Sequence, residues 1–192
     1  AEERELEVVL RGRTVRLRSA AGVFSAGGLD LGTRVLLDRV GDPPATGVLA
    51  DVGCGWGPVA VAMAQASPGA TVWAVDVNER AVDLTARNAA ALGLDNVRAA
   101  EATRALPQMQ DQGVLLDEIW SNPPVRIGKS ALHDLLRSWL ARLAPTGQAH
   151  LVVQRNLGAD SLHRWLESAL GVEVTRTASA KGYRVLTARP AR

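Results

Sequence analysis

Asp51-Val52-Gly53-Cys54-Gly55-Trp56-Gly57 is the stretch that decides the fold. It follows the apolar run Val48-Leu49-Ala50, which predicts a buried strand, and it precedes a helix of small residues expected over 58–66. Glycines at alternate positions let the main chain turn sharply and approach a ligand, and the first N–H groups of the next helix are free to donate. The stretch therefore predicts a nucleotide-binding turn between a strand and a helix.

Strand and helix patterns alternate along the rest of the chain, which predicts an α/β fold with a mostly parallel sheet and helices on both faces. We expect strands over 48–50, 71–75, 97–100, 114–120 and 150–153, and helices over 31–40, 58–66, 78–92, 132–143 and 162–170, with Pro145-Thr146-Gly147 ending the fourth helix. Two hairpins flank this pattern. One is expected over 5–18 around Arg11-Gly12, covering one edge of the sheet, and the other over 172–188 around Lys181-Gly182.

Length and composition predict a single domain over 1–192, with 1–20 as an N-terminal hairpin extension. The chain has 192 residues, of which 47% are hydrophobic and 22% charged, as is ordinary for a globular protein. Its one cysteine, Cys54, excludes an internal disulfide and a cysteine metal cluster, so we expect a cytoplasmic protein without a metal. No apolar run approaches the roughly 20 residues of a membrane helix, so we expect no membrane association.

Charge is distributed unevenly although the formal net charge is only +2. Residues 1–120 carry 11 basic and 16 acidic side chains, a balance of −5, whereas residues 121–192 carry 11 basic and 4 acidic side chains, a balance of +7. A solvated arginine-rich surface is one explanation. The other is a surface that faces a polyanion and attracts its phosphates.

Acidic residues beside the glycines indicate which nucleotide binds. Asp76 ends the second strand of the repeat, where a carboxylate can accept both ribose hydroxyls. Asp51 stands two residues before Gly53 and is suited to a cationic amino group, which a dinucleotide lacks. These residues favour S-adenosylmethionine over NAD. Cys54 is interpreted as a small apolar filler under the cofactor, with a nucleophilic role as the alternative.

Ser121-Asn122-Pro123-Pro124 follows the fourth strand of the repeat. Proline forces the preceding residue out of the helical region, so Asn122 is held extended at the strand tip. Its amide oxygen and the Pro123 carbonyl are placed to accept both hydrogens of an exocyclic amine, which would favour a pyramidal nitrogen. Catalysis would then depend mainly on proximity and in-line geometry. The motif predicts an amino-group methylase.

Several segments in one order resemble the small-domain methyltransferase family that includes bacterial 16S and 23S rRNA guanine exocyclic-amine methylases. The segments are Gly22-Val23-Phe24-Ser25, Leu29-Asp30-Leu31-Gly32-Thr33, Asp51–Gly57, Asn122–Lys129, Val152-Val153-Gln154 and Lys181-Gly182-Tyr183-Arg184. The resemblance implies a seven-stranded class I methyltransferase fold, Rossmann-like, with S-adenosylmethionine as donor and S-adenosylhomocysteine as product.

The resemblance also assigns residues to the two ends of the site. Those predicted to bind the cofactor are Phe24, Thr33, Asp51, Gly53, Cys54, Gly55, Gly57, Asp76, Val77, Glu101, Ala102, Thr103 and Asn122. Asn122 and Pro123 are predicted to be catalytic. Those predicted to bind the substrate are Pro124, Val125, Arg126 and Lys129, with Arg126 and Lys129 on phosphates. Weaker phosphate candidates are Arg155, Lys181 and Arg184.

Two positions depart from the family pattern. Val125 stands where many relatives have an aromatic residue that stacks on the target base, so stacking is expected to come from Phe24 or Trp56, or to be weaker. Thr103 stands where many relatives have an aspartate that holds the adenine amine, with Glu101 two residues earlier.

Three functions remain open from the sequence. The first is methyl transfer to a guanine exocyclic amine in ribosomal RNA, with the small subunit or its RNA as partner and a monomer or homodimer as the active form. The second is methyl transfer to a protein glutamine or to a nitrogen of a small molecule. The third is a non-catalytic RNA-binding module on a methyltransferase scaffold.

Overall fold

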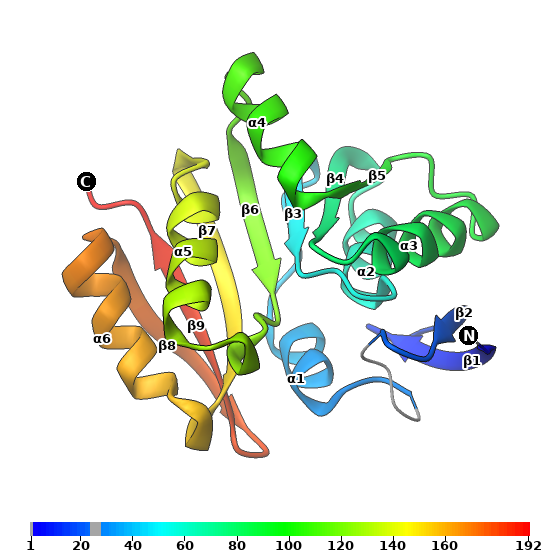
Figure 1. Ribbon diagram of the computed structural model, residues 1–192, viewed down its shortest axis with the longest axis horizontal. Helices are drawn as coiled ribbons and strands as arrows, with labels where there is room; N and C mark the ends of the chain where they lie inside the picture. The colour runs from blue at the N-terminus through cyan, green and yellow to red at the C-terminus, as the bar shows by residue number, and fades with distance from the viewer. Residues whose placement is uncertain (1, 24–27) are drawn as a thin grey trace.

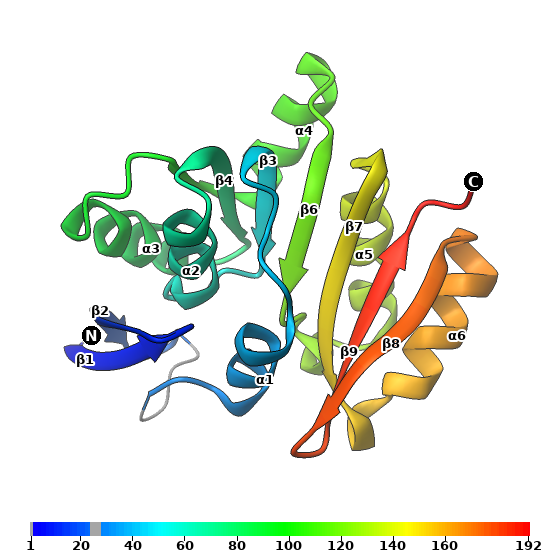
Figure 2. The ribbon, with the colours of Figure 1, turned by 180° about the vertical axis from the view of Figure 1, so that it is seen from behind.

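The structure is a computed structural model that describes residues 2–23 and 28–192. Within these ranges it has a seven-stranded sheet of order β5-β4-β3-β6-β7-β9-β8 and a separate two-stranded sheet, β1-β2 (Figures 1 and 2). The strands are β1 (Glu3–Leu10), β2 (Arg13–Ala20), β3 (Thr46–Val52), β4 (Gly69–Asp76), β5 (Val97–Glu101), β6 (Leu116–Ser121), β7 (Leu143–Gln154), β8 (Glu173–Ala180) and β9 (Tyr183–Arg189). The helices are α1 (Leu31–Arg39), α2 (Pro58–Ala66), α3 (Glu79–Ala91), α4 (Ala102–Gln112), α5 (Lys129–Leu140) and α6 (Ala159–Leu170), with 3-10 turns η1 (Val125–Ile127) and η2 (Arg155–Leu157).

The sheet reverses its winding direction between β3 and β6. Strands β3 to β7 are all parallel, and the chain runs outward from β3 through β4 to β5 before it returns to β6 on the other side of β3. Strand β9 then pairs antiparallel with β7, and β8 forms the edge. The predicted seven-stranded, mostly parallel fold is confirmed. Loops after β3, β4, β6 and β7 consequently converge at the switch point, where such sheets bind ligands.

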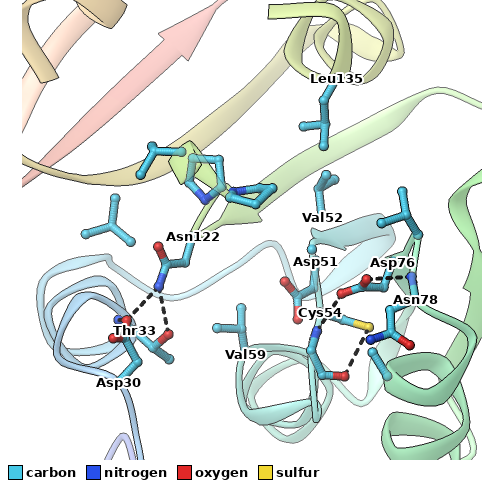
Figure 3. Close-up of a pocket in the computed structure, with 18 of the residues that line it drawn as sticks. Asp30, Thr33, Asp51, Val52, Cys54, Val59, Asp76, Asn78, Asn122 and Leu135 are labelled. Carbon is cyan, nitrogen blue, oxygen red and sulfur yellow. Dashed lines mark hydrogen bonds between the residues drawn. The ribbon is translucent and has the colours of Figure 1, made fainter. Parts of the chain in front are cut away.

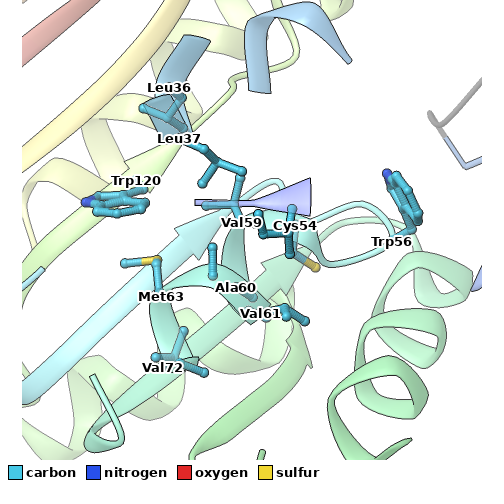
Figure 4. Close-up of a cluster of buried hydrophobic side chains, with 14 of the residues drawn as sticks. Leu36, Leu37, Cys54, Trp56, Val59, Ala60, Val61, Met63, Val72 and Trp120 are labelled. Carbon is cyan, nitrogen blue, oxygen red and sulfur yellow. The ribbon is translucent and has the colours of Figure 1, made fainter. Parts of the chain in front are cut away.

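Both faces of the sheet are covered, and each has its own hydrophobic cluster. One cluster joins α1, α2 and α3 to one face and contains Leu36, Met63 and Trp120 (Figure 4). The other joins α4, α5 and α6 to the opposite face and contains Ile119 and Leu136. Because side chains alternate along a strand, the neighbours Ile119 and Trp120 of β6 enter different clusters. The central strands therefore bury apolar side chains on both faces, as a parallel sheet requires.

Each hairpin turns at a pair whose second residue is glycine. The φ angles are +49° at Arg11 and +84° at Gly12, and +52° at Lys181 and +81° at Gly182. Two consecutive positive φ angles are typical of the type I′ turn, whose twist matches that of the paired strands. The pattern Arg-Gly or Lys-Gly between alternating residues therefore predicted both hairpins correctly.

The N-terminal hairpin does not cover an edge of the sheet, so that expectation was wrong. It lies on the helices that cover one face. Arg11 donates through its guanidinium to the carbonyls of Leu37 and Val40, at 3.0 and 2.8 Å. The main-chain N–H of Arg18 donates to the side-chain oxygen of Asn88 on α3, and the Asn88 side-chain nitrogen donates to the Arg18 carbonyl. These polar contacts to helix α3 and to the end of α1 hold the hairpin there.

In the second half of the chain one expectation was also wrong, and one helix was missed. Pro145-Thr146-Gly147 does not end a helix, because α5 ends at Leu140 and these residues lie within β7. The register of β6 with β7 shifts between Leu116 and Glu118, and a Cβ on Gly147 would lie 2.7 Å from the Leu116 carbonyl oxygen. Proline and glycine therefore belong to a bulge. Helix α4 was not predicted, and Pro107 lies inside it.

None of the helices in the described part of the chain has the length and apolar character needed to cross a bilayer.

Candidate functional site

A cavity of about 590 Å³ opens at the switch point, within the range of small-molecule sites (Figure 3). Residues predicted for the site that line it are Thr33, Asp51, Gly53, Cys54, Gly55, Asp76, Val77, Ala102, Asn122, Pro123, Pro124, Val125 and Arg126. Those that do not are Gly57, Glu101, Thr103 and Lys129, and Phe24 lies outside the described residues. Thr103 is exposed on α4, so the structure does not place it at the cavity.

The glycine loop is built by left-handed backbone conformations. The φ angles are +82° at Gly53, +55° at Gly55 and +106° at Gly57, which side-chain-bearing residues rarely adopt. The N–H groups of Gly53 and Cys54 both donate to the Val75 carbonyl, at 2.8 and 2.9 Å. These bonds fix the loop against the end of β4. Gly57 acts from behind the cavity, where a Cβ would lie 3.0 Å from the Thr85 hydroxyl.

Asp76 organises the end of β4. One carboxylate oxygen accepts from the Gly55 N–H and the other accepts from the Asn78 N–H, both at 2.9 Å. The carboxylate is thereby fixed at the cavity wall. Because each oxygen can accept more than one hydrogen bond, the group retains capacity for ligand hydroxyls.

Asp51 is a buried acid at the floor of the cavity, 1% exposed. Its Oδ2 accepts from the Ala60 N–H on α2 at 3.0 Å. Burial raises the pKa of Asp51 to about 8, and nearby Asp76 adds to the rise, although the Ala60 bond opposes it. A cation bound next to Asp51 would favour its ionised form.

Cys54 lies under the glycine loop and is 4% exposed. Burial raises the pKa of its thiol well above the ordinary value, and the negative charge of Asp51 acts in the same direction. The Thr85 hydroxyl lies 3.4 Å from its sulfur and donates to the Gly55 carbonyl at 2.9 Å. A nucleophilic cysteine needs an accessible thiolate, so these surroundings favour the packing role.

Asn122 is held by helix α1 through contacts that span about 90 residues of sequence. Its Nδ2 donates to Asp30 Oδ2 at 2.8 Å and to Thr33 Oγ1 at 3.2 Å. Because a carboxylate only accepts, the amide nitrogen must face Asp30. Figure 3 shows the amide oxygen pointing away from α1. Asp30 also caps α1 by accepting from the Thr33 N–H.

The structure adds two residues to which the sequence assigned no role. Asp30 fixes the orientation of the Asn122 amide, and Tyr183 lines the cavity at the start of β9. The Tyr183 ring packs directly against Gly32, so that a Cβ added to Gly32 would lie only 2.8 Å from a ring carbon. Burial raises the pKa of Tyr183, with Asp30 adding to the rise and Arg126 opposing it. The ring therefore lies close to both groups. In the sequence, the only indication of a role for Asp30 or Tyr183 was that each lies in a segment that resembles the methyltransferase family.

The predicted stacking and phosphate residues lie in different surroundings. Trp56 is 3% exposed and belongs to the cluster beneath the hairpin, so most of its ring is covered (Figure 4). Arg126 and Lys129 are exposed on η1 and at the start of α5. Arg184 is half-buried and paired with Asp160, so it is not a free phosphate ligand.

Together these residues fit S-adenosylmethionine. The glycine loop leaves room for a nucleoside, and Asp76 offers oxygens for its ribose hydroxyls. Asp51 supplies a buried carboxylate whose ionisation a cationic amino acid would favour. No group of three histidine, cysteine, aspartate or glutamate side chains in the described ranges is arranged to hold a metal ion.

Comparison with known proteins agrees with this geometry. The family model "Methyltransferase small domain" matches residues 14–187. The uncharacterized protein YbxB of Bacillus subtilis (strain 168) is 34% identical over 180 residues, which cover 94% of this chain and 88% of that protein. The ribosomal RNA small subunit methyltransferase C of Chromohalobacter salexigens is 38% identical over 180 residues, covering 90% of this chain and 50% of that one.

A solved structure is similar over the whole chain. It is a T. thermophilus 16S rRNA N2 methyltransferase in complex with AdoMet and guanosine, with a TM-score of 0.82 and 25% identity. The match covers 100% of this chain and 51% of that one. The chain thus spans about half the length of both rRNA methyltransferases. Because the family model covers nearly all of the sequence, the chain belongs to the Methyltransferase small domain family and is an S-adenosylmethionine-dependent methyltransferase.

Proposed function

We propose that this enzyme methylates the exocyclic amine of a guanine in ribosomal RNA of the small subunit. The observation that carries the proposal is the fixed orientation of the Asn122 amide. Its nitrogen is bound to Asp30 and Thr33, so its oxygen remains to accept a hydrogen bond from a substrate N–H.

An amide oxygen in this position suits an aromatic amine. The lone pair of such an amine is delocalised into the ring, which makes the nitrogen a poor nucleophile. Asn122 Oδ1 would accept one amine hydrogen. The Pro123 carbonyl already accepts from the Val125 N–H at 2.9 Å and keeps a second lone pair for the other hydrogen. Accepting both hydrogens favours a pyramidal nitrogen with its lone pair localised.

S-adenosylmethionine, when bound, supplies a methyl group already activated by the sulfonium. The protein therefore needs no strong base at the amine. What the chain supplies is position, through the rigid tip of β6 and the α1 anchor. Asp51, the glycine loop and Asp76 would hold the donor at the adjacent strand ends.

Guanine in ribosomal RNA is supported by the relatives and by charge. Two relatives are named as small-subunit or 16S rRNA methyltransferases, and one was solved with guanosine. Residues 121–192 carry the +7 balance, and Arg126 and Lys129 follow the catalytic tip directly. Cations next to an acceptor site provide sequence-independent attraction to a phosphate backbone.

The test uses labelled S-adenosylmethionine with separate small subunits, naked 16S rRNA and total RNA. We expect label in 16S rRNA, on the exocyclic amine of a guanine. A protein extract and free nucleosides are incubated in parallel. Label confined to glutamine residues of protein, or to small molecules, would overturn the RNA assignment. Absence of S-adenosylmethionine binding by calorimetry would leave only a non-catalytic module.

A further inference from the structure

Two 3-10 turns lie at the end of the cavity where Asn122 would meet the methyl-accepting substrate, and they have the same arrangement of residues. Turn η1 follows β6 and η2 follows β7, and these strands are paired neighbours. Each turn has an exposed arginine and an exposed apolar side chain, Arg126 with Ile127 and Arg155 with Leu157. Each ends at a glycine with φ near +100° that begins a long helix. We call the two turns the jaws.

The apolar side chains of the jaws are unusual because they face solvent beside a cavity. Ile127 is 50% exposed and Leu157 is 47% exposed, and both line the cavity. Among the described residues, six large hydrophobic side chains are exposed, and three of these, with Val77 included, border this one cavity. Apolar surface gathered at the mouth of a site indicates a bound partner. Tyr183 adds an aromatic face to the same wall.

Free cations stand on both sides of the jaws. Arg126 and Lys129 lie on one side, and Arg155 and Lys181 on the other, where the Arg155 N–H donates to the Gly182 carbonyl at 2.8 Å. All four side chains belong to exposed residues, and within the described ranges none forms an ion pair. The partner thus meets positive charge on either side of an apolar centre.

We propose that the jaws hold one unpaired nucleotide of RNA, with its base against Tyr183, Ile127 and Leu157. The neighbouring phosphates then contact Arg126 and Lys129 on one side and Arg155 and Lys181 on the other. This inference rests on the proposed function and specifies the substrate as a guanine outside a double helix. Asn122 lies half-buried below the jaws, so a base still paired within a duplex cannot bring its amine to the amide.

Alternating apolar and cationic groups fit this occupant better than a peptide. Bases present flat faces that stack on aromatic and apolar side chains, and each nucleotide carries one phosphate on either side. A glutamine-bearing peptide would need acidic residues at both flanks to meet the four cations. Tyr183 also supplies the aromatic contact that Val125 does not.

Binding is measured by fluorescence anisotropy with S-adenosylhomocysteine present. One probe is a single-stranded oligouridine that carries one guanine, and the other is the same strand annealed to its complement. We expect the single strand to bind at least about tenfold more tightly than the duplex. Equal or tighter binding of the duplex would overturn the inference.

Matched variants locate the contacts. Arg155→Gln combined with Lys181→Gln should weaken single-strand binding about tenfold and lower the slope of log K against log salt by about 1–2. The control is Arg13→Gln, because Arg13 is exposed beside Pro68 at the amino end of the sheet. Arg13→Gln should change neither quantity beyond a small uniform effect. A double variant indistinguishable from the control would contradict the phosphate contacts.

The apolar contacts have their own controls. Leu157→Ser and Tyr183→Leu should each weaken single-strand binding about five- to tenfold, whereas Tyr183→Phe should retain it. Leu115 is 44% exposed, immediately precedes β6 and does not line the cavity, so Leu115→Ser should have no effect. Calorimetry of S-adenosylmethionine binding checks that each variant is folded. Wild-type affinity of Leu157→Ser and Tyr183→Leu for RNA would refute the base contacts.

These outcomes separate the two proposals. Single-strand binding that depends on the jaws, together with no label in any RNA, would refute guanine methylation and leave the jaws as an RNA site. Label in 16S rRNA, together with jaw variants that behave as their controls, would refute only the jaws.

Discussion

The two halves of the cavity are built in opposite ways. The donor half, at the ends of β3 and β4, is internally bonded around its polar groups: Asp51 is 1% exposed, and Asp76 is fixed by two main-chain N–H groups. The acceptor half, at the ends of β6 and β7, is open, with Ile127 and Leu157 about half exposed. Its two arginines, Arg126 and Arg155, form no ion pair with any residue that the structure describes.

This difference shows what each half must recognise. A small cofactor can be enclosed, so the chain itself satisfies the polar groups around it and leaves only those that the ligand needs. A large polyanion cannot be enclosed, so the chain leaves apolar faces and cations exposed for the substrate to cover. Asn122 stands at the boundary, anchored from one side and free on the other.

The largest effect is expected from Asn122→Ala. It removes the acceptor of the amine hydrogen, and kcat/KM should fall roughly 10²–10³-fold, as when one aligned hydrogen bond is lost from a transition state. S-adenosylmethionine affinity should stay within a few-fold by calorimetry. Asp30→Asn serves as a companion, since it lets the Asn122 amide turn around and should lower kcat/KM with less effect. Normal turnover of Asn122→Ala would remove this residue from the mechanism.

Gly57→Ala should damage the donor half next. Its φ is +106°, and the new Cβ would lie 3.0 Å from Thr85 Oγ1, so the free energy of unfolding should fall by about 1–3 kcal/mol. S-adenosylmethionine affinity should also fall about tenfold or more, because the loop must shift. Urea unfolding and calorimetry measure the two effects. Gly113→Ala is the control, since Gly113 has φ +63° with no neighbour within 4 Å. If Gly57→Ala and Gly113→Ala lost the same unfolding free energy and the same cofactor affinity, the close contact between Gly57 and Thr85 would be contradicted.

Asp51 predicts a pH dependence of the donor half. Folding raises its pKa from 3.8 to about 8, so between these values the folded protein holds a proton that the unfolded chain has lost. The free energy of unfolding should therefore decrease as pH rises through this window. A cationic ligand reverses the preference, so S-adenosylmethionine affinity should increase from about pH 6 to about pH 7.5, by at most about tenfold per pH unit.

Substitution separates this effect from other titrations. Asp51→Asn cannot ionise, so the part of both slopes that comes from Asp51 should disappear, and affinity should fall at the upper end of the range. Asp111→Asn, exposed on α4, should leave both slopes as they are. Calorimetry in two buffers of different ionisation enthalpy would detect the released proton. No proton release by the wild type would contradict the assignment.

The smallest effect is expected from Cys54→Ala. The thiol is buried and its pKa is raised, so it contributes packing rather than chemistry. We expect kcat/KM within about twofold of wild type and slow reaction of the native protein with iodoacetamide. A loss of activity comparable to that of Asn122→Ala would restore the nucleophilic alternative.

Local rules account for what the sequence predicted of the fold. Proline at the first position and small residues predicted α2 over 58–66, the range that the structure shows. Dipeptides ending in glycine predicted both hairpin turns. Helix α4 was missed because Pro107 interrupts its sequence pattern. Ala105 and Met109, four residues apart, are nevertheless its buried positions and pack into the hydrophobic cluster. Pro145 to Gly147 was misread because a bulge and a helix end use the same residue types.

The same distinction applies to the cavity. The glycine loop and Asp76 are short-range features, so their spacing was visible in the sequence. The Asp30 contact to Asn122 joins residues 92 positions apart, and the Tyr183 ring on β9 reaches Gly32 on α1. Neither pairing follows from periodicity. The placement of the N-terminal hairpin on the helices was equally invisible, because it depends on Arg11 and Asn88 meeting distant main chain.

A crystal structure of the enzyme with S-adenosylhomocysteine and guanosine would test the central claim most directly. We predict that Asn122 Nδ2 stays on Asp30 while Oδ1 lies within about 3.2 Å of the guanine exocyclic nitrogen. A guanine amine bound away from Asn122, or an amide turned so that its nitrogen faces the base, would contradict the account.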